Sequence, residues 1–323
     1  MLEHKVLVGI DGGGTYTRVA VADMEGRLLA NVKRQGGAFL AKDANAVENV
    51  CLAVLAAVEE AGCALGDVAA LAAGVAGYDN KSDLHWVRKL TKIKGLRCPI
   101  LNVNDAVVAH RGALLFEPGI IAIAGTGSVI AAITEKGEFI RNYDVRHYAN
   151  NAARCLTQSS VEKILAGETD HTDAALVDQM LRYFAADDIS ALKALNKKDF
   201  GVDNAQKMKL FGDFAPAVTA AALDGSRLAR QVCIRAAEET VEGIRLLGTR
   251  FTSAPVPVAL IGSVANSTFI KNTIGEILQE EKNADYSLVE PALPPAFGAV
   301  LMAARLANIE AEPFQGNLAQ SHA

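Results

Sequence analysis

The sequence predicts an α/β protein with two domains in tandem and a cleft between them. One observation behind this prediction is a repeated unit of apolar strand, glycine-rich turn and second apolar strand, with its turn at Asp11–Thr15 and again at Gly125–Ser128. A further turn glycine follows at the same distance in both copies, Gly26 in the first and Gly137 in the second. The other observation is that predicted strands and helices alternate through both halves of a chain of 323 residues, which is long enough for two cores.

The elements of the first half follow from apolar runs and from helical spacing. Val47, Cys51, Leu55 and Val58 recur at the spacing of a helix, and Gly62 ends it. Uninterrupted apolar runs bounded by glycine or by polar residues predict buried strands. The expected order is three strands of a meander within Lys5–Ala22 and Arg27–Lys33, a helix over 44–61, a strand over 68–75, a short helix over 81–90, a strand over 100–103 and a helix over 106–115.

The second half repeats this theme with longer helices. The stretch Ala229–Leu247 is amphipathic, and Pro294-Pro295 introduces a last helix. The tail from residue 310 is polar and contains Pro313 and Gly316, so we expect it to be frayed. The expected order is strands within 119–140, helices over about 159–184 and 214–251, a strand over 257–261 and a helix over 296–306.

Composition restricts the class of protein and its partners. The net charge of −5 comes from interspersed charges without a basic stripe, so we expect no nucleic acid partner. No uncharged apolar run approaches the length of a membrane span, and the first residues lead directly into a strand, so we expect a soluble cytoplasmic protein with no membrane partner. The cysteines are few and show no metal-type spacing, which indicates reduced thiols: Cys51, Cys63, Cys98, Cys155 and Cys233.

The two glycine-rich turns predict a clamp for a polyphosphate. Glycine lets main-chain N–H groups approach a phosphate, and hydroxyl groups add donors. A carboxylate that opens such a turn is suited to Mg²⁺ or its waters, which makes Asp11 the metal candidate. Neither turn is a Walker A loop or a dinucleotide fingerprint, and a plain hairpin is the alternative. The candidate phosphate-binding residues are Asp11, Gly12, Gly13, Gly14, Thr15, Thr17, Gly125, Thr126, Gly127 and Ser128.

Asn104 and Asp105 follow a predicted buried strand and precede a predicted helix. A carboxylate at the end of a strand, beside a cleft, is suited to accept a proton from an attacking alcohol during phosphoryl transfer. Either side chain could instead cap the helix that begins at Ala106, and one aspartate could serve both purposes. Asp105 is therefore the candidate general base.

The order of the motifs resembles the actin-like ATPase superfamily of sugar kinases, heat-shock chaperones and actin. The motifs are the DGGGT turn at 11–15, a GxxG segment at Gly74–Gly77, the strand that ends in Asn104-Asp105-Ala106, the GTGS turn at 125–128, Gly262-Ser263 and the helix opened by proline and glycine near Gly298. Within the superfamily the chain is most similar to the N-acetylglucosamine kinase and BadF-BadG-BcrA-BcrD ATPase branch.

The resemblance implies a fold of two ribonuclease H-like domains in tandem. It implies an amino-terminal domain over 1–112, joined by the carboxyl-terminal helix at about 296–308, a second domain over 113–295 and a tail over 309–323. It further implies an ATP- and Mg²⁺-dependent carbohydrate kinase, with a small sugar-like acceptor and a homodimeric state. Asp105 matches the general base, Gly262 and Ser263 match the adenosine-binding turn, and Gly74–Gly77 and Gly298 match the connecting segments. The implied acceptor residues are Gly77, Asn104, Asp105, Asn150 and Asn151.

The acceptor segment departs from the family pattern. The family carries an acidic pair after the second glycine turn, whereas this chain has Asn150 and Asn151, and Phe39 stands where an asparagine contacts the sugar. The acceptor could differ from N-acetylglucosamine, with Arg146 and His147 helping to form its wall and an arginine favouring an acidic or lactyl sugar. Alternatively the protein is a nucleotide-dependent switch without sugar kinase activity.

A third branch of the superfamily activates CoA-linked reductases and dehydratases through an iron–sulfur cluster held at a dimer interface by cysteines. Cys155 is the single cysteine in the segment after the second glycine turn. One cysteine in each subunit would supply only two ligands in a dimer, which disfavours this branch.

Overall fold

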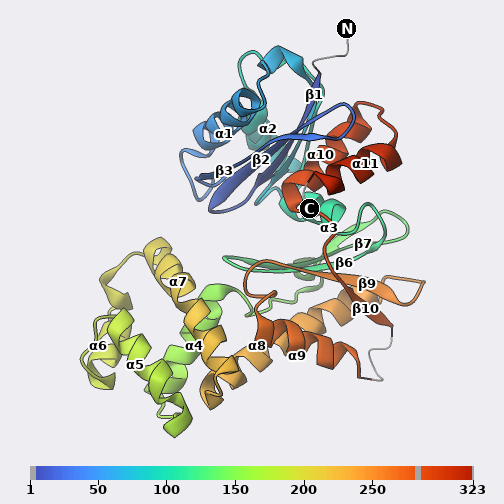
Figure 1. The fold of residues 1–323 in the computed structure, drawn as a ribbon. Helices are drawn as coiled ribbons and strands as arrows, with labels where there is room; N and C mark the ends of the chain where they lie inside the picture. Colours follow the sequence, from blue (N-terminus) through green and yellow to red (C-terminus); the bar gives the residue numbers. More distant parts are fainter. Residues whose placement is uncertain (1–4, 281–284, 322–323) are drawn as a thin grey trace. The chain divides into compact units, whose positions relative to one another are not determined.

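The computed structural model describes residues 5–280 and 285–321, and the chain divides into two compact units. Unit 1 lies within Met1–Pro118 and Glu290–Ala323, and unit 2 lies within Gly119–Val289 (Figure 1). These boundaries differ by a few residues from those that the sequence suggests, and the carboxyl-terminal segment returns to unit 1. The predicted α/β fold class is confirmed. In the described part of the chain, no helix is long and apolar enough to cross a bilayer.

Unit 1 is built on a mixed sheet in the order β3-β2-β1-β4-β5. The first three strands form the predicted antiparallel meander, and the other two run parallel to β1. This order brings the carboxyl ends of β1, β4 and β5 to one edge of the sheet. The strands are β1 (Val6–Gly12), β2 (Tyr16–Asp23), β3 (Leu28–Gln35), β4 (Val68–Val75) and β5 (Ile100–Asn104).

Helices cover both faces of this sheet because the strand residues are apolar on both sides. Alternate residues of β1, such as Val8 and Ile10, pack with α1 and α2, whereas Leu7 packs with α10 and α11 (Figure 1). The predicted short helix over 81–90 is a 3₁₀ turn at Lys81–Asp83 followed by α2. The helices are α1 (Ala46–Glu60), α2 (Leu84–Thr91), α3 (Asp105–Ala113), α10 (Pro295–Leu306) and α11 (Ala311–Gln320).

The tail differs from the sequence prediction, because α11 is an ordered helix where we expected a frayed end. Phe314 and Leu318 lie four residues apart, so both face the core of unit 1 and are almost fully buried. The Asn317 side chain donates to Glu25 O at 2.7 Å. The polar composition of the segment conceals this two-residue apolar stripe.

Close packing between α10 and α3 gives a first prediction. A Cβ atom on Gly298 would lie 2.1 Å from Val108 O and 2.4 Å from Gly112 N, both backbone atoms of α3. We expect Gly298→Ala to lower the free energy of unfolding by about 3 kcal/mol, because two rigid helices would have to separate. Gly316→Ala in α11 is the control, since nothing lies within 4 Å of its added Cβ. Equal unfolding midpoints for the two variants in urea would contradict this prediction.

Unit 2 contains a second mixed sheet, in the order β10-β9-β6-β7-β8. The strands β6, β7 and β8 form the predicted antiparallel meander, and β9 and β10 extend it in parallel. The sequence did not predict β10, which has only four residues and is partly exposed. The strands are β6 (Gly119–Ala124), β7 (Ser128–Ile133), β8 (Phe139–Arg141), β9 (Val256–Ile261) and β10 (Tyr286–Val289).

The helices of unit 2 are more numerous than predicted. The helix α7 begins before the predicted start and continues through Pro216, while α6 and α9 were not predicted. Aromatic contacts join this region, with Phe184 packed against Phe200, Phe211 and Phe214. The helices are α4 (Ala153–Leu165), α5 (Ala174–Tyr183), α6 (Ile189–Lys197), α7 (Asn204–Leu223), α8 (Arg227–Gly248) and α9 (Thr268–Leu278).

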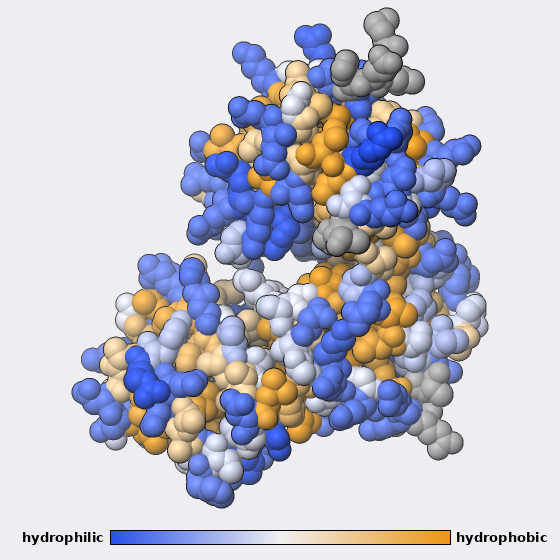
Figure 2. Space-filling model, viewed as in Figure 1, coloured by the Kyte–Doolittle hydropathy of each residue, from blue (hydrophilic) through white to orange (hydrophobic). Residues whose placement is uncertain are grey.

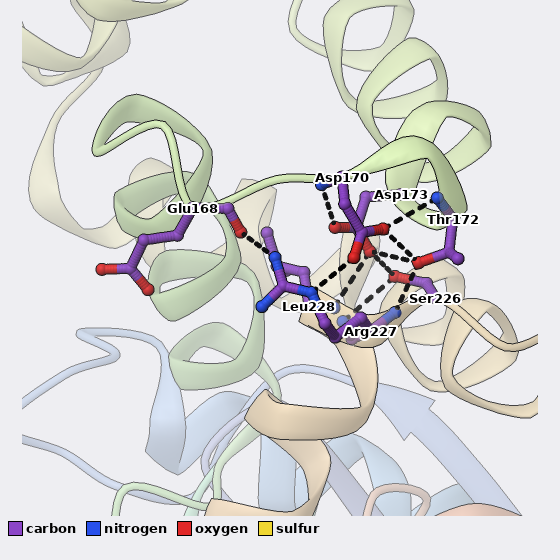
Figure 3. Close-up of polar contacts among 8 residues, drawn as sticks. Glu168, Asp170, Thr172, Asp173, Ser226, Arg227 and Leu228 are labelled. Atoms are coloured by element: carbon purple, nitrogen blue, oxygen red, sulfur yellow. Dashed lines mark hydrogen bonds and ion pairs between the residues drawn. The ribbon is translucent and has the colours of Figure 1, made fainter.

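A polar network around Asp173 holds the start of α8 against the start of α5 (Figure 3). Asp173 is fully buried and accepts hydrogen bonds from Leu228 N at 2.9 Å and Ser226 Oγ at 2.8 Å. Arg227 Nε donates to Asp170 Oδ2 at 2.6 Å. The buried carboxylate thus satisfies a free N–H group of the first turn of α8.

The visible face of each unit is mostly hydrophilic, with hydrophobic residues in separate patches (Figure 2). This surface agrees with the interspersed charges of the sequence.

Candidate functional site

The candidate catalytic residues lie at the carboxyl edge of the unit 1 sheet. Asp11 of β1 is paired with Gly74 of β4, and Gly74 is paired with Val103 of β5, directly before Asn104 and Asp105. A Cβ atom on Gly74 would lie 3.1 Å from Asp105 Cα, so the glycine allows α3 to begin close to β4. Ligands of sheets with parallel strands commonly bind at this edge.

The β1–β2 turn presents exposed main-chain N–H groups. Gly14 and Thr15 are exposed, and no hydrogen bond among the described residues uses their N–H groups. Gly13 supports the turn by donating to Tyr16 O at 3.1 Å and accepting from Ala38 N at 3.0 Å. A Cβ on Gly12 would lie 2.6 Å from Ala38 Cβ, so its role is close packing. The turn therefore has the donors that an anion requires.

Thr17 does not fit its predicted role as a phosphate ligand. Its side chain is fully buried, and its hydroxyl donates to Gly36 O at 2.9 Å. Thr17 is close to the turn in sequence, but side chains alternate between the two faces of β2, and that of Thr17 lies on the buried face. Thr17 instead fixes the segment that supports the turn.

Asp11 is almost fully buried at the end of β1 and forms an ion pair with Arg18, 3.0 Å away. Burial raises the pKa of Asp11, and the charge and hydrogen bond of Arg18 oppose that shift. Within the described residues there is no cluster of three or more metal-ligating side chains. A single carboxylate fits Mg²⁺, which is usually held by one or two carboxylates together with phosphates and water.

Asp105 begins α3, and its carboxylate takes part in capping this helix. Asn104 Oδ1 and Asp105 Oδ1 both accept from Ala106 N, at 2.9 and 3.0 Å. Burial of the carboxyl group, reinforced by the charge of Asp11, raises the pKa of Asp105 to about 7. A carboxylate with such a pKa is well matched to general base catalysis near neutral pH.

Two of the predicted acceptor residues of unit 1 shape the loop after β4. Asn104 Nδ2 donates to Tyr78 O at 3.1 Å and so holds that loop next to Asp105. Gly77 has a positive φ of 77°, and a Cβ there would lie 2.4 Å from the Phe39 ring. The Phe39 ring therefore packs on Gly77.

The two predicted nucleotide-binding turns of unit 2 are neighbours. A Cβ on Gly125 would lie 3.8 Å from Ser263 N, and Gly262 approaches Ala124 O so closely that no larger residue fits. Thr126 and Gly127 are exposed at the turn tip. Ser128 Oγ is buried and has no hydrogen-bond partner among the described residues. The parallel pairing of β6 with β9 brings these turns together.

The predicted acceptor residues of unit 2 lie in residues 146–152, which we call the acceptor loop. Asn150 is exposed, and its N–H donates to Glu239 Oε2 at 2.5 Å. Asn151 is buried, and its Nδ2 donates to Thr240 Oγ1 at 2.7 Å. Sequence reasoning missed Glu239 and Thr240, because they lie far along the chain in an otherwise ordinary amphipathic helix.

Other contacts attach the acceptor loop to its surroundings. Asn142 is fully buried, accepts from Ile130 N and donates to His147 O, so it joins the loop to β7. Arg146 is exposed and Arg154 is half-buried, and neither has an ion-pair partner among the described residues. His147 packs against α8 at Gly243, where an added Cβ would lie 3.0 Å from its ring.

Comparisons with known proteins agree with this arrangement. Residues 8–143 match the model of the BadF/BadG/BcrA/BcrD ATPase family. The chain is 27% identical over 139 residues to an N-acetylmuramic acid/N-acetylglucosamine kinase of Clostridium acetobutylicum, with 43% of this chain and 45% of that protein covered. This alignment therefore spans less than half the length of that relative. The chain is 26% identical over 225 residues to the glucosamine kinase GspK of Vibrio cholerae, covering 69% of this chain and 73% of that protein.

A solved structure supports the fold over nearly the whole length. A ROK family glucokinase from Streptomyces griseus, in complex with glucose and AMPPNP, superposes with a TM-score of 0.62 at 21% identity. The superposition covers 94% of this chain and 99% of the glucokinase. The chain thus has the fold of this glucokinase, and its residues 8–143 are similar to the BadF/BadG/BcrA/BcrD ATPase family.

Proposed function

We propose that this protein is an ATP- and Mg²⁺-dependent kinase that transfers the γ-phosphate to a hydroxyl group of a small sugar or amino sugar. The observation that carries the proposal is Asp105, a buried carboxylate directly after the end of β5, with a pKa raised to about 7. The names of the relatives, an amino sugar kinase and a glucosamine kinase, support the same reaction class.

Each group of site residues has a separate role in phosphoryl transfer. The N–H groups of Gly14 and Thr15, and the turn at Gly125–Ser128, bind phosphate oxygens, and Gly262 and Ser263 contact the nucleoside. Asp11 would hold Mg²⁺ or one of its waters, and the ion would supply positive charge to neutralise the phosphates. Asp105 orients the attacking hydroxyl and accepts its proton as the new bond to phosphorus forms. Exclusion of water from the site favours transfer to the sugar over hydrolysis.

We further propose that the acceptor site differs from that of an N-acetylglucosamine kinase and accepts a carboxylate-bearing amino sugar. Asn150 and Asn151 replace an acidic pair with neutral amides, which removes negative charge from the loop. Arg146, the first residue of the loop, and Arg154, in the first turn of α4, have guanidinium groups without an ion-pair partner among the described residues. Arginine is well suited to bidentate binding of a carboxylate.

A panel of acceptors tests both proposals. ADP production is measured with ATP and Mg²⁺ in the presence of glucose, glucosamine, N-acetylglucosamine or N-acetylmuramic acid. The last two differ by a lactyl group that carries a carboxylate, so they form a matched pair. We expect the highest kcat/KM for N-acetylmuramic acid, by about tenfold over its partner, because one charge-assisted contact has roughly that effect.

The panel also separates the kinase from the alternative of a nucleotide-dependent switch. The loss of the acidic pair is the observation that favours a switch. A switch would hydrolyse ATP, if at all, at a rate that no acceptor changes. Acceptor-independent turnover across the panel would therefore overturn the proposed kinase.

A further inference from the structure

Glu239 is a buried carboxylate that belongs to none of the sequence motifs. It lies in α8, and only 8% of its surface is exposed, whereas its neighbour Glu238 is exposed. A carboxylate is not buried without cost unless its oxygens receive hydrogen bonds. The groups that donate hydrogen bonds to the Glu239 carboxylate therefore indicate the structural role of this residue.

The two oxygens of Glu239 receive different donors. Arg235, one turn earlier in α8, donates through Nε to Oε1 at 2.9 Å and compensates the charge. The main-chain N–H of Asn150 donates to Oε2 at 2.5 Å, which is a short, charge-assisted contact. Glu239 therefore attaches the acceptor loop to α8 at Asn150.

The next residue of α8 fixes the other half of the Asn150-Asn151 pair. Thr240 Oγ1 donates its single proton to Ala236 O at 2.7 Å, so it has to act as the acceptor towards Asn151. Asn151 Nδ2 consequently faces Thr240, at 2.7 Å. This contact leaves Asn151 Oδ1 buried and without a hydrogen-bond partner among the described residues. A buried amide oxygen without a partner is able to accept a further hydrogen bond.

Asn150 and Glu239 both line a cavity of about 360 Å³, whose other lining residues belong to α4 and α8. Asn150, Arg235 and Glu239 all line this cavity, together with Gln158 and Gln231. Polar side chains thus line the same cavity as Asn150, and Glu239 holds the main chain of Asn150. The contact with Glu239 uses the main-chain N–H of Asn150, so the side chain of Asn150 takes no part in it.

We propose that Glu239 is the positioning residue of the acceptor loop, and that it sets the affinity for the acceptor by fixing Asn150 and, with Thr240, Asn151. This inference rests on the proposed kinase function. Glu239 acts through the loop and accepts no proton from the acceptor. Its removal should therefore weaken acceptor binding and leave the ATP-binding turns and Asp105 unaffected.

The test compares Glu239→Gln with Glu238→Gln, the same substitution at the adjacent exposed position. Steady-state kinetics are measured with the best acceptor of the panel and with ATP varied separately. We expect Glu239→Gln to raise the acceptor KM about tenfold and Glu239→Ala about a hundredfold, because a hydrogen bond to a charged group is weakened or lost. The ATP KM and kcat should stay within about threefold, and Glu238→Gln should match the wild type.

Further measurements separate a positioning role from a merely structural one. In Glu239→Gln, amide exchange should become faster in the acceptor loop, with an unchanged rate in β1 and β5. An acceptor KM equal to that of Glu238→Gln would overturn the inference and leave the kinase proposal standing. A loss of acceptor affinity, ATP affinity and kcat together in Glu239→Gln would also overturn the inference. If the wild type shows no acceptor-dependent turnover, the kinase proposal itself fails, and this inference fails with it.

Discussion

Asp105→Asn is expected to lower kcat for phosphoryl transfer by about 10²- to 10⁴-fold, the usual range for removal of a general base. The amide keeps the size of the side chain and its hydrogen bond from Ala106 N, but it cannot accept a proton at neutral pH. The affinity for ATP should change little, because the phosphate-binding turns do not include Asp105. Stopped assays of the phosphorylated acceptor, together with calorimetric titration of ATP, measure the two quantities.

The control for this variant is Asp187→Asn, which makes the same change at an exposed position of unit 2. The pH profile is a second check. Because the pKa of Asp105 is raised to about 7, the carboxyl group is protonated and inactive below that pH and becomes an active base above it. We expect kcat/KM of the wild type to rise with pH up to about 7. Mg²⁺ near Asp11 would cancel part of the charge that raises this pKa, and it would move the midpoint lower. A wild-type rate in Asp105→Asn would remove the residue from the proposed mechanism.

Asp173→Ala is expected to lower the free energy of unfolding of unit 2 by about 3 kcal/mol, and more if several donors stay unsatisfied. The carboxylate accepts from Asp170 N, Ser226 Oγ and Leu228 N, and the substitution leaves these donors without their acceptor (Figure 3). Thermal unfolding followed by circular dichroism should show a midpoint that is lower by roughly 10 °C. Asp178→Ala, at an exposed position of α5, is the control and should leave the midpoint nearly unchanged.

The effect of Asp173 also depends on pH in a definite direction. Burial alone would raise its pKa, but the hydrogen bonds from Asp170, Leu228 and Ser226 together hold it below the ordinary value of 3.8. A carboxyl group with a lowered pKa stabilises the folded state above its unfolded-state pKa, and this contribution is lost as the pH falls through the folded-state pKa. The stability difference between the wild type and Asp173→Ala should therefore be largest near pH 7 and shrink below about pH 4. A difference that grows on acidification would contradict this account.

Much of the fold could be predicted because its strands are unusually apolar and its turns are rich in glycine. The duplicated strand–turn–strand unit gave the two meanders, and residues at helical spacing gave α1 and α8. The helix α11 was missed because only Phe314 and Leu318 carry its buried face. The strand β10 was missed because four partly exposed residues give no clear alternation. Short or weakly amphipathic elements depend on tertiary packing that local patterns do not encode.

The sequence by itself determined the local features of this protein. It placed glycines where backbones approach closely, Asp11 at the end of a strand and Asp105 at the start of a helix, and these features follow from chain geometry within a few residues. Only the tertiary structure decided that Thr17 faces inward, that burial and Asp11 raise the pKa of Asp105, and that Glu239 holds Asn150. Burial, pKa shifts and contacts between distant residues depend on which elements pack together, and that information lies in the folded arrangement rather than in any one segment.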